Sequence, residues 1–452
     1  MKVILLSGGS GKRLWPLSND SRSKQFLKML RTKDGSLESM VQRVWGQLER
    51  SGLSEHSYIA ANKSQLDILQ NQLPKNLRYI VEPEIRDTFP AIALSATFVL
   101  SELGAALEET VVILPVDPYV EDDFFEKLKT LDAVLQQSNA DLALIGVKPT
   151  FPSEKYGYII PAGNENAAYS NVLSFSEKPN QAKANELISN GALWNCGVFA
   201  FKLRYLIQEL NKRGIATNYR DLSEQYKSMQ KISFDYEIVE KTQSIVVQKY
   251  EGYWKDLGTW NTLTEEMDAD LIGKGIVYES VNTHVINELD VPVAVMGLQD
   301  VVVAVSPDGI LVSDKETSPK IKDALNGYLQ RPMYEEKRWG YYKILDYRTL
   351  DTGEEVIVKR TFIKAGCNLS THKHVRRNEE WTVISGEGEF YLNDQVFPLL
   401  TGTHLKVTAN HIHSARAITD LEIIEIQRGF DINEGDIIRE SLNWPVNVVV
   451  GG

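Results

Sequence analysis

The sequence predicts an α/β domain built on a doubly wound, mostly parallel sheet, then a short β-rich linker domain, then a C-terminal all-β barrel. In the first half, short apolar runs alternate with helical patterns, as in parallel sheets with crossover helices. After about residue 265 the apolar runs become short and β-rich. From about residue 336 onward, strand patterns separated by Gly and Asn turns dominate, which is typical of a small barrel. We therefore expect domains at residues 1–265, 266–335 and 336–452.

The elements of the first two domains follow from apolar periodicity. Short apolar runs predict strands at residues 3–6, 57–61, 77–81, 110–114 and 142–147. Apolar residues at helical spacing, or longer apolar windows, predict helices over about 37–48, 90–103 and 121–137. In the linker, the pattern predicts a strand at 301–305 and one helix at 318–329.

Composition and charge restrict the class of protein. A chain of 452 residues is too long for one ordinary core. The net charge of −12 argues against nucleic acid as the main partner, and an acidic protein that binds anionic substrates must gather its cations locally. The chain has no run of about eighteen apolar residues, its first residues lead straight into a strand, and it has only two cysteines. We expect a cytoplasmic protein without a membrane span, signal peptide or disulfide framework.

A glycine-rich turn directly follows the first predicted strand. Backbone N–H groups in such a turn can approach a phosphate chain closely, and basic side chains beside it add positive charge. The turn is neither a Walker A loop, because Arg13 replaces the Ser or Thr, nor a Rossmann fingerprint, because Leu14 replaces the third glycine. A plain Gly/Ser turn is the alternative, but Lys24 close by favours a nucleoside triphosphate held at the end of the strand. The turn and its flanks are Leu6, Ser7, Gly8, Gly9, Ser10, Gly11, Lys12 and Arg13.

Two aspartates offer acids for a metal–phosphate site. Asp117 ends a buried strand, and Mg²⁺ usually takes one or two carboxylates together with substrate phosphates. Asp256 is a second acid far along the chain, in a tryptophan-flanked turn that Gly258 permits. The alternatives are a helix cap for Asp117 and a plain tryptophan-rich turn for the second segment.

Further polar groups suit a sugar phosphate or a base. Glu177 and Lys178 supply an acid for sugar hydroxyls and an amine for the phosphate, although a surface Glu–Lys pair is the simpler alternative. Asn195 supplies an amide close to a glycine that allows close backbone approach. Residues before the helix predicted from residue 90 are candidates for contacting a base or ribose. They are Glu82, Arg86 and Asp87.

The string from Ser7 to Ser18, with Trp15-Pro16-Leu17-Ser18, resembles the signature of the sugar-1-phosphate nucleotidyltransferases, in their mannose-1-phosphate guanylyltransferase branch. The resemblance covers about residues 1–265 and implies GTP and mannose-1-phosphate as substrates. Its implied catalytic residues are Arg13, Lys24, Asp117 and Asp256, the two aspartates holding Mg²⁺. Its implied nucleotide site is Leu6 to Arg13 with Glu82, Arg86 and Asp87, and its sugar-phosphate pocket is Tyr156, Gly157, Glu177, Lys178 and Asn195.

One departure from this family concerns the base. Asp87 stands where the guanylyltransferases usually have asparagine. A carboxylate still accepts hydrogen bonds from guanine N1 and N2, so guanine stays the expected base, while another base or sugar stays open.

Histidines concentrate in the third domain. Of the seven histidines, five are His372, His374, His404, His411 and His413. His372 and His374 share one face of a predicted strand, because side chains alternate with period two. With Glu379 and His413 they form a set that suits Zn, Mn, Fe, Co or Ni and does not single out one metal. An ordinary surface strand is the alternative for an isolated His-x-His.

The spacing of these residues resembles the cupins. Gly366, His372, His374, Glu379 and Gly386 match the first cupin motif throughout. The second motif keeps Gly402 and His413 but not its usual Pro, Gly and Asn. With the segment 336–340, nearly the whole chain resembles the bifunctional mannose-1-phosphate guanylyltransferase/mannose-6-phosphate isomerases. This implies that His372, His374, Glu379 and His413 bind Zn²⁺ or another divalent transition metal.

The groups that would move a proton in such an isomerase are altered. Ser414 stands where an Arg usually follows the last ligand. Lys359 and Glu380 are the candidates for a base, and Arg377 and Arg416 are the candidates for holding a 6-phosphate.

Three functions follow from these patterns. The leading hypothesis is an enzyme that makes GDP-mannose and whose cupin interconverts mannose-6-phosphate and fructose-6-phosphate. The second is a nucleotidyltransferase whose cupin is structural or binds an effector. The third is a non-catalytic sugar-nucleotide sensor, which the basic and acidic residues Arg13, Lys24, Asp117, Lys178 and Asp256 disfavour. We expect a homo-oligomer and no nucleic-acid or membrane partner.

Overall fold

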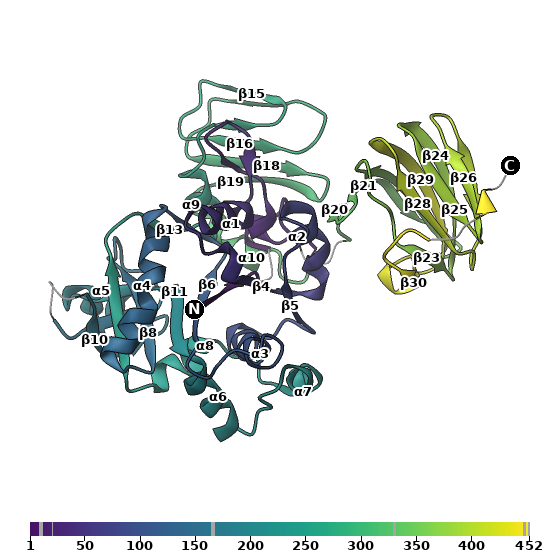
Figure 1. The fold of residues 1–452 in the computed structure, drawn as a ribbon. Coiled ribbons are helices and arrows are strands. Elements are labelled where there is room, and N and C mark those ends of the chain that lie inside the picture. The colour runs from purple at the N-terminus through teal and green to yellow at the C-terminus, as the bar shows by residue number, and fades with distance from the viewer. Residues whose placement is uncertain (9–11, 20, 164–167, 329–330, 446–448, 451–452) are drawn as a thin grey trace.

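A nine-stranded sheet forms the centre of the first domain in the computed structural model (Figure 1). The structure describes residues 1–8, 12–19, 21–163, 168–328, 331–445 and 449–450. The strands are β1 Lys2–Leu6, β4 Ser57–Asn62, β5 Tyr79–Glu82, β6 Thr110–Pro115, β8 Leu142–Val147, β9 Tyr158–Pro161, β10 Ser170–Ser176, β11 Leu193–Lys202 and β12 Ile245–Tyr250. Their order across the sheet is β5-β4-β1-β6-β11-β8-β12-β10-β9.

The direction of these strands confirms a mostly parallel sheet. β5, β4, β1 and β6 are mutually parallel, as are β8 and β12, and only β10 and β11 run against the others. The chain leaves β1 toward β4 and β5, then returns to β6 on the other side of β1. This reversal creates a crevice at the carboxyl ends of β1 and β6, the usual place for a ligand in such sheets.

Helices cover both faces of the sheet, which confirms the doubly wound class. One apolar cluster packs α1 Met40–Arg50 and α4 Asp123–Ser138 on the first face. A second cluster packs α3 Thr88–Ser101 and α6 Leu203–Lys212 on the other. α3 is apolar nearly all round because α7 Tyr219–Gln225 and α8 Phe234–Glu237 cover its outer side.

The linker is β-rich, and its short strands pair mainly in parallel. They are β14 Leu271–Ile272, β15 Gly275–Tyr278, β16 His284–Asn287, β17 Val293–Met296, β18 Val301–Ser306 and β19 Gly309–Asp314. β14, β16 and β18 pair in parallel, as do β15 and β17, so successive turns of chain stack. The helix predicted at 318–329 is wrong in length: α10 is only Ile321–Ala324, after a 3-10 turn, because the chain turns at Gly327 with φ +81°.

The linker domain forms hydrogen bonds with the loop that follows the glycine-rich turn. Ser306 Oγ donates to the Pro16 carbonyl at 2.8 Å. The Arg22 guanidinium donates to Glu288 at 2.9 Å and lies over the Tyr334 ring at 5.0 Å. Pro16 and Arg22, which precede Lys24, are therefore held by residues more than 260 positions away in sequence.

The third domain is all-β, as predicted, and consists of two six-stranded sheets. Figure 1 shows it set apart from the first domain, in green and yellow. One sheet contains β20 Tyr334–Lys337, β21 Gly340–Thr349, β22 Glu355–Ile363, β29 Leu421–Gly429, β24 Arg377–Ser385 and β27 His404–Val407. The other contains β30 Ile437–Ser441, β23 Thr371–His374, β28 His413–Ala417, β25 Gly388–Leu392, β26 Gln395–Leu399 and β31 Val449–Val450.

The core between these sheets follows strand alternation. In β24, Arg377, Glu379 and Trp381 are buried and the residues between them are not, so every second side chain faces inward. The domain boundaries near residues 265 and 335 stay predictions. Within the described residues, no helix is both long and apolar enough to cross a membrane.

Candidate functional site

The glycine-rich turn that is predicted to hold phosphate (residues 7–13, the phosphate turn) begins where β1 ends at the crevice. Ser7 N–H continues the sheet by donating to the Ala60 carbonyl at 2.9 Å, and the buried Gln25 amide donates to the Ser7 carbonyl at 2.6 Å. These bonds fix the start of the turn. Gly9, Ser10 and Gly11 lie outside the described residues. Lys12 then opens a 3-10 turn, and the Arg13 side chain is exposed at the crevice.

Lys24 brings the two predicted acids together. Its Nζ lies 2.7 Å from Asp117 Oδ2 and 3.5 Å from Asp256 Oδ1. Burial alone would lower the pKa of Lys24, but the two carboxylates outweigh it and raise that pKa. Burial would raise the pKa of Asp117, but Lys24 outweighs it and lowers that pKa. Lys24 and Asp117 are therefore both charged at neutral pH.

Local strand pairing explains why acids so far apart in sequence meet. Asp117 lies two residues after the end of β6 and directly precedes the short strand β7 Pro118–Val120. β7 pairs antiparallel with β13 Trp254–Asp256, and Asp256 lies opposite Pro118. This pairing places both carboxylates at the carboxyl end of β6, beside the phosphate turn.

The acids fit a magnesium ion. Asp256 Oδ1 is buried and accepts no hydrogen bond from any described residue. Buried acceptors without a hydrogen bond are rare, and this oxygen, 3.5 Å from Lys24 Nζ and beside a second carboxylate, suits a hard divalent cation. A Cβ at Gly258 would lie 3.0 Å from Asp256 Oδ2, so glycine leaves room at this carboxylate.

A cavity of about 370 Å³ lies on the other side of the turn. Among the predicted nucleotide residues, Leu6, Gly8, Glu82 and Asp87 line it. Its other walls include Thr88, from the segment that the sequence indicated, and Asn62 and Lys231, which the sequence did not indicate. The Arg86 guanidinium does not line it, because it donates to the Met229 carbonyl at 2.8 Å and to Glu84 at 3.0 Å.

Glu82 is the buried acid of this cavity. The Tyr226 hydroxyl donates to Glu82 Oε2 at 2.8 Å. Burial raises the pKa of Glu82 to about 7 despite this hydrogen bond. Asp87 caps α3 with φ +71°, its carboxylate accepting from Thr88 N–H at 2.7 Å. The cavity therefore carries two carboxyl groups, and that of Glu82 titrates near neutral pH.

The predicted sugar-phosphate residues also meet. A Cβ at Gly157 would lie 2.5 Å from Glu177 Oε2 and 3.3 Å from the Asn195 Cβ, so only glycine fits between them. Lys178 pairs with Glu177. Asn195 Nδ2 donates to Asp235 Oδ1 at 2.8 Å.

Asp235 is a buried acid of this pocket that sequence reasoning missed. Burial, together with the nearby Glu177 charge, raises its pKa to about 7. No spacing in the sequence links it to Asn195, which lies forty residues earlier.

Aromatic side chains join the sugar pocket to the two acids. The Tyr156 ring lies edge-on to Trp194 and Trp254, with centroids 4.9 Å and 5.5 Å away. Burial, with the charges of Asp256 and Asp117 close by, raises the pKa of Tyr156 above its usual value. The predicted sugar-phosphate residues therefore lie close to the acids around Lys24.

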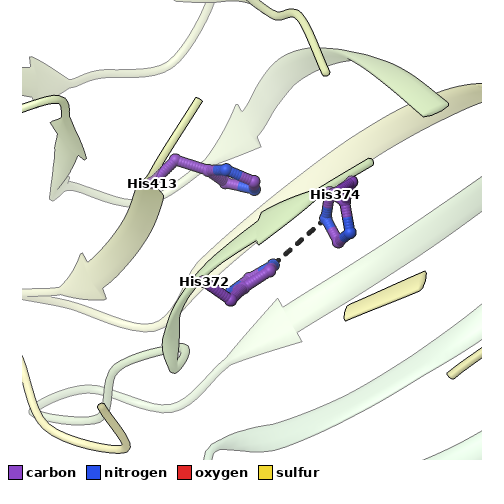
Figure 2. Close-up of side chains that lie close together, drawn as sticks. All are labelled: His372, His374 and His413. Atoms are coloured by element: carbon purple, nitrogen blue, oxygen red, sulfur yellow. Dashed lines mark hydrogen bonds between the residues drawn. The ribbon is translucent and has the colours of Figure 1, made fainter. Parts of the chain in front are cut away.

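A second site lies between the sheets of the third domain. Figure 2 shows the rings of His372 and His374, from β23, and of His413, from β28, directed toward one another. One ring nitrogen from each lies within 4.8 Å of the others, and all three residues are buried. The other nitrogens of His372 and His413 lie 2.6 Å from Ser370 O and 3.0 Å from His411 O. These carbonyls hold Nδ1 as the donor and turn Nε2 inward, as in metal-ligating imidazoles.

The histidines fit a divalent transition metal. Burial and the neighbouring imidazoles hold the pKa of His372 well below its ordinary value, so it is a neutral donor. His413 Nε2 is buried and makes no hydrogen bond to any described residue. A neutral imidazole and a buried ring nitrogen without a hydrogen bond, as in His372 and His413, are donors that such metals take.

Glu379 lies beside these histidines and is held by other groups. Its Oε1 lies 3.0 Å from His374 Nε2 and accepts from Gln427 Nε2 at 2.8 Å. Its Oε2 accepts from Trp381 Nε1 at 3.0 Å and lies 3.5 Å from His413 Nε2. Burial would raise the pKa of Glu379, but the adjacent His374 and His413 outweigh it and hold that pKa well below its ordinary value.

The pocket over these histidines contains only some of the predicted isomerase groups. Lys359 and Arg377 line it. Glu380 does not, because it alternates to the outer face of β24 and pairs with Lys406 at 3.5 Å. Arg416 also lies elsewhere, where it pairs with Glu389. The pocket instead has cations that sequence reasoning missed. They are Lys337, Arg338 and Arg439.

Known proteins match both parts of this chain. A family model described as nucleotidyl transferase matches residues 2–272, and one described as mannose-6-phosphate isomerase C-terminal matches residues 330–441. XanB, a xanthan biosynthesis protein of Xanthomonas campestris pv. campestris, is 30% identical over 475 residues, which are 96% of this chain and 97% of that protein. The mannose-1-phosphate guanylyltransferase RfbM of Salmonella typhimurium is 29% identical over 479 residues and 96% of each chain.

A solved structure is also similar. The crystal structure of a mannose-1-phosphate geranyltransferase from Thermus thermophilus superposes with a TM-score of 0.62 and 28% identity, covering 72% of this chain and 98% of that one. The fold and these similarities together define the class of protein, an α/β nucleotidyltransferase domain joined to a cupin domain. The chain belongs to the nucleotidyl transferase family and ends in a mannose-6-phosphate isomerase C-terminal domain.

We expect Glu82→Gln to stabilise the protein more at pH 8 than at pH 5. The pKa of Glu82 is about 7 in the folded chain, whereas the pKa of a glutamate in an unfolded chain is about 4.3. Because this pKa is raised, the folded state binds the proton of Glu82 more tightly than the unfolded state does. The contribution of that proton to the free energy of unfolding is fully present below about pH 4 and is lost as pH rises through 7. Glutamine does not titrate. Thermal unfolding at both pH values, with exposed Glu55→Gln as control, measures the difference; an equal shift at both would contradict it.

Proposed function

We propose that the first domain transfers a guanylyl group from GTP to mannose-1-phosphate and releases pyrophosphate, giving GDP-mannose. The observation that carries this proposal is the contact of Lys24 with Asp117 and Asp256, beside the phosphate turn at the switch point of the sheet. The Salmonella relative is a mannose-1-phosphate guanylyltransferase, which supports the choice of base and sugar. The name of the Xanthomonas relative supports a role in supplying polysaccharide synthesis.

The reaction is an in-line displacement at the α-phosphorus. A phosphate oxygen of the sugar forms a bond to this phosphorus while its bond to the pyrophosphate oxygen breaks. Both reactants are anionic, so the protein must position them and offset their charge; no covalent intermediate is needed. Mg²⁺ held by Asp117 and Asp256 would neutralise phosphate oxygens. Lys24 and Arg13 add fixed positive charge on the same side of the crevice.

The two substrates would occupy opposite sides of these acids. The turn that follows Leu6 would hold the triphosphate, and the cavity of Glu82 and Asp87 would hold the base, whose N1 and N2 donors suit carboxylates. The sugar phosphate would lie against Tyr156 and Gly157. Lys178 would take its phosphate, and Glu177 and Asn195 would accept from or donate to its hydroxyls.

A product assay tests this assignment. Purified protein is incubated with each nucleoside triphosphate and with mannose-, glucose- or galactose-1-phosphate, and the sugar nucleotide is identified by mass spectrometry. We expect GDP-mannose to form fastest. A clear preference for UTP or CTP would overturn the choice of base, and transfer to another hexose phosphate would overturn the choice of sugar.

We expect Asp117→Ala and Asp256→Ala each to lower the turnover number by about a hundredfold or more, because each removes a proposed metal ligand. Asp256→Ala leaves the closer Lys24–Asp117 pair in place, so we expect it to change thermal unfolding less than Asp117→Ala, which removes the nearest partner of the largely buried Lys24. Pyrophosphate release at millimolar magnesium measures the effect. Glu55→Ala, an exposed acid of the same domain, serves as the control. Near-normal turnover in both aspartate variants would refute the site.

We further propose that the cupin interconverts mannose-6-phosphate and fructose-6-phosphate. A metal on His372, His374 and His413 would polarise the sugar oxygens. The reaction moves a proton between C1 and C2, which needs a base in the pocket. Burial lowers the pKa of Lys359, which favours its neutral form, and its Nζ lies 4.5 Å from the centroid of Tyr342. Lys359 is therefore our choice of base.

A second candidate function for this domain is metal-dependent binding of an effector. The outward direction of Glu380 and Arg416 favours it, because two groups expected to act on the sugar face away from the pocket. In that case the domain would bind a sugar phosphate without converting it.

We expect the wild-type chain to bind one divalent transition metal and His374→Ala to lose it, because that change removes a central donor. Metal content by elemental analysis and conversion of fructose-6-phosphate are measured together. His404→Ala is the matched control, since His404 is exposed and contacts Thr382 instead. A metal-free wild type contradicts the site, whereas bound metal without conversion would favour effector binding.

A further inference from the structure

The cupin pocket has one wall from another domain. Among the described residues that line it, nearly all lie between positions 337 and 442. The exception is Asp67, which belongs to α2, Leu66–Gln72, in the transferase domain. The pocket that holds His372 and His374 is therefore not built by the cupin alone.

Hydrogen bonds on both sides of the domain boundary hold α2 in place. Gln72 Nε2 donates to Glu336 Oε2 at 2.7 Å, and the Lys364 ammonium group of the cupin donates to Asn71 Oδ1. The same Gln72 amide donates to the Phe26 carbonyl at 2.9 Å and accepts from Ser39 Oγ at 2.7 Å. The buried Gln72 amide both donates and accepts hydrogen bonds, and it therefore fixes the position of α2. Because Asp67 belongs to α2, these bonds also hold Asp67 at the pocket.

Asp67 adds a negative group to a basic part of the pocket. Burial lowers the pKa of Arg338, and the Asp67 carboxylate opposes that shift. Burial would lower the pKa of Lys337, but the charges of Glu335 and Glu434, with a smaller contribution from Asp67, outweigh it and raise that pKa. Arg439 lines the pocket too, where it pairs with Glu434 at 2.7 Å. One region thus offers guanidinium donors for an anion, next to a carboxylate that can only accept.

We propose that Asp67 is a ligand-binding residue of the cupin pocket, which makes that pocket a composite site of two domains. The ligand class is a phosphorylated polyol. Arg338 and Arg439 would take the phosphate, as guanidinium groups do, and Asp67 would accept hydrogen bonds from hydroxyl groups. The choice of a sugar phosphate rests on the proposed function of the cupin, but it requires binding and not isomerisation.

Calorimetry with two probes separates this role from a structural one. The metal-loaded full chain is titrated with sorbitol 6-phosphate, which cannot isomerise, and with inorganic phosphate. In Asp67→Asn we expect sorbitol 6-phosphate to bind about tenfold more weakly, because charge-assisted hydrogen bonds to its hydroxyls are lost. Inorganic phosphate should bind as tightly as in the wild type or more tightly, because a nearby negative charge is gone. Glu55→Gln, the matched loss of an exposed acid, should change neither.

The outcomes are distinct. Weaker binding of sorbitol 6-phosphate by Asp67→Asn, with inorganic phosphate bound as tightly as in the wild type or more tightly, supports the composite site. Equal affinity of sorbitol 6-phosphate for wild type and Asp67→Asn overturns it and leaves the proposed isomerase intact. Equal weakening of both probes also overturns it, since Asp67 would then only hold the domains together. A wild type that binds neither probe refutes sugar-phosphate binding by the cupin, and this inference with it.

Discussion

The burial of Lys24 between Asp117 and Asp256 is the interaction on which the catalytic end of the first domain depends. Two carboxylates close together in a crevice repel each other, and burial disfavours both charged forms. The ammonium group offsets that repulsion by lying against both carboxylates. In the proposed reaction the same group would supply charge toward a triphosphate. One side chain would therefore serve both the charge balance of the folded site and the proposed chemistry.

Several distant segments maintain this balance. Asp117 sits where β6 ends, and Asp256 reaches it only because β13 pairs with β7. The loop that leads to Lys24 is held by the linker domain, through Ser306 and through the pairing of Arg22 with Glu288. The linker is thus part of the architecture of the site, although it contributes no catalytic group.

The cupin site also contains a buried carboxylate, and it stabilises that carboxylate with different neighbouring groups. Glu379 is buried beside three imidazoles, and its charge is compensated by hydrogen bonds from Trp381 and Gln427 and by the adjacent His374. The histidines, oriented by backbone carbonyls, keep nitrogen atoms directed to one point. Each site is therefore preorganised by groups that do not themselves react.

The sequence by itself determined whatever depends on local periodicity. Alternating runs indicated the doubly wound sheet, the turn after Leu6 indicated a phosphate site, and period-two alternation put His372 and His374 on one face. The helix expected at 318–329 was too long, because the turn at Gly327 depends on backbone conformation that apolar spacing does not report.

Only the tertiary structure decided what depends on pairing between distant segments. It brought Asp235 to Asn195, directed Arg416 away from the cupin pocket, and placed Asp67 in a different domain's site. Strand register and domain packing set these neighbours, and neither leaves a signal in residue spacing. The residues that could carry chemistry at each strand end were therefore predictable from the sequence, whereas the residues that surround them were set only by the folding of the chain.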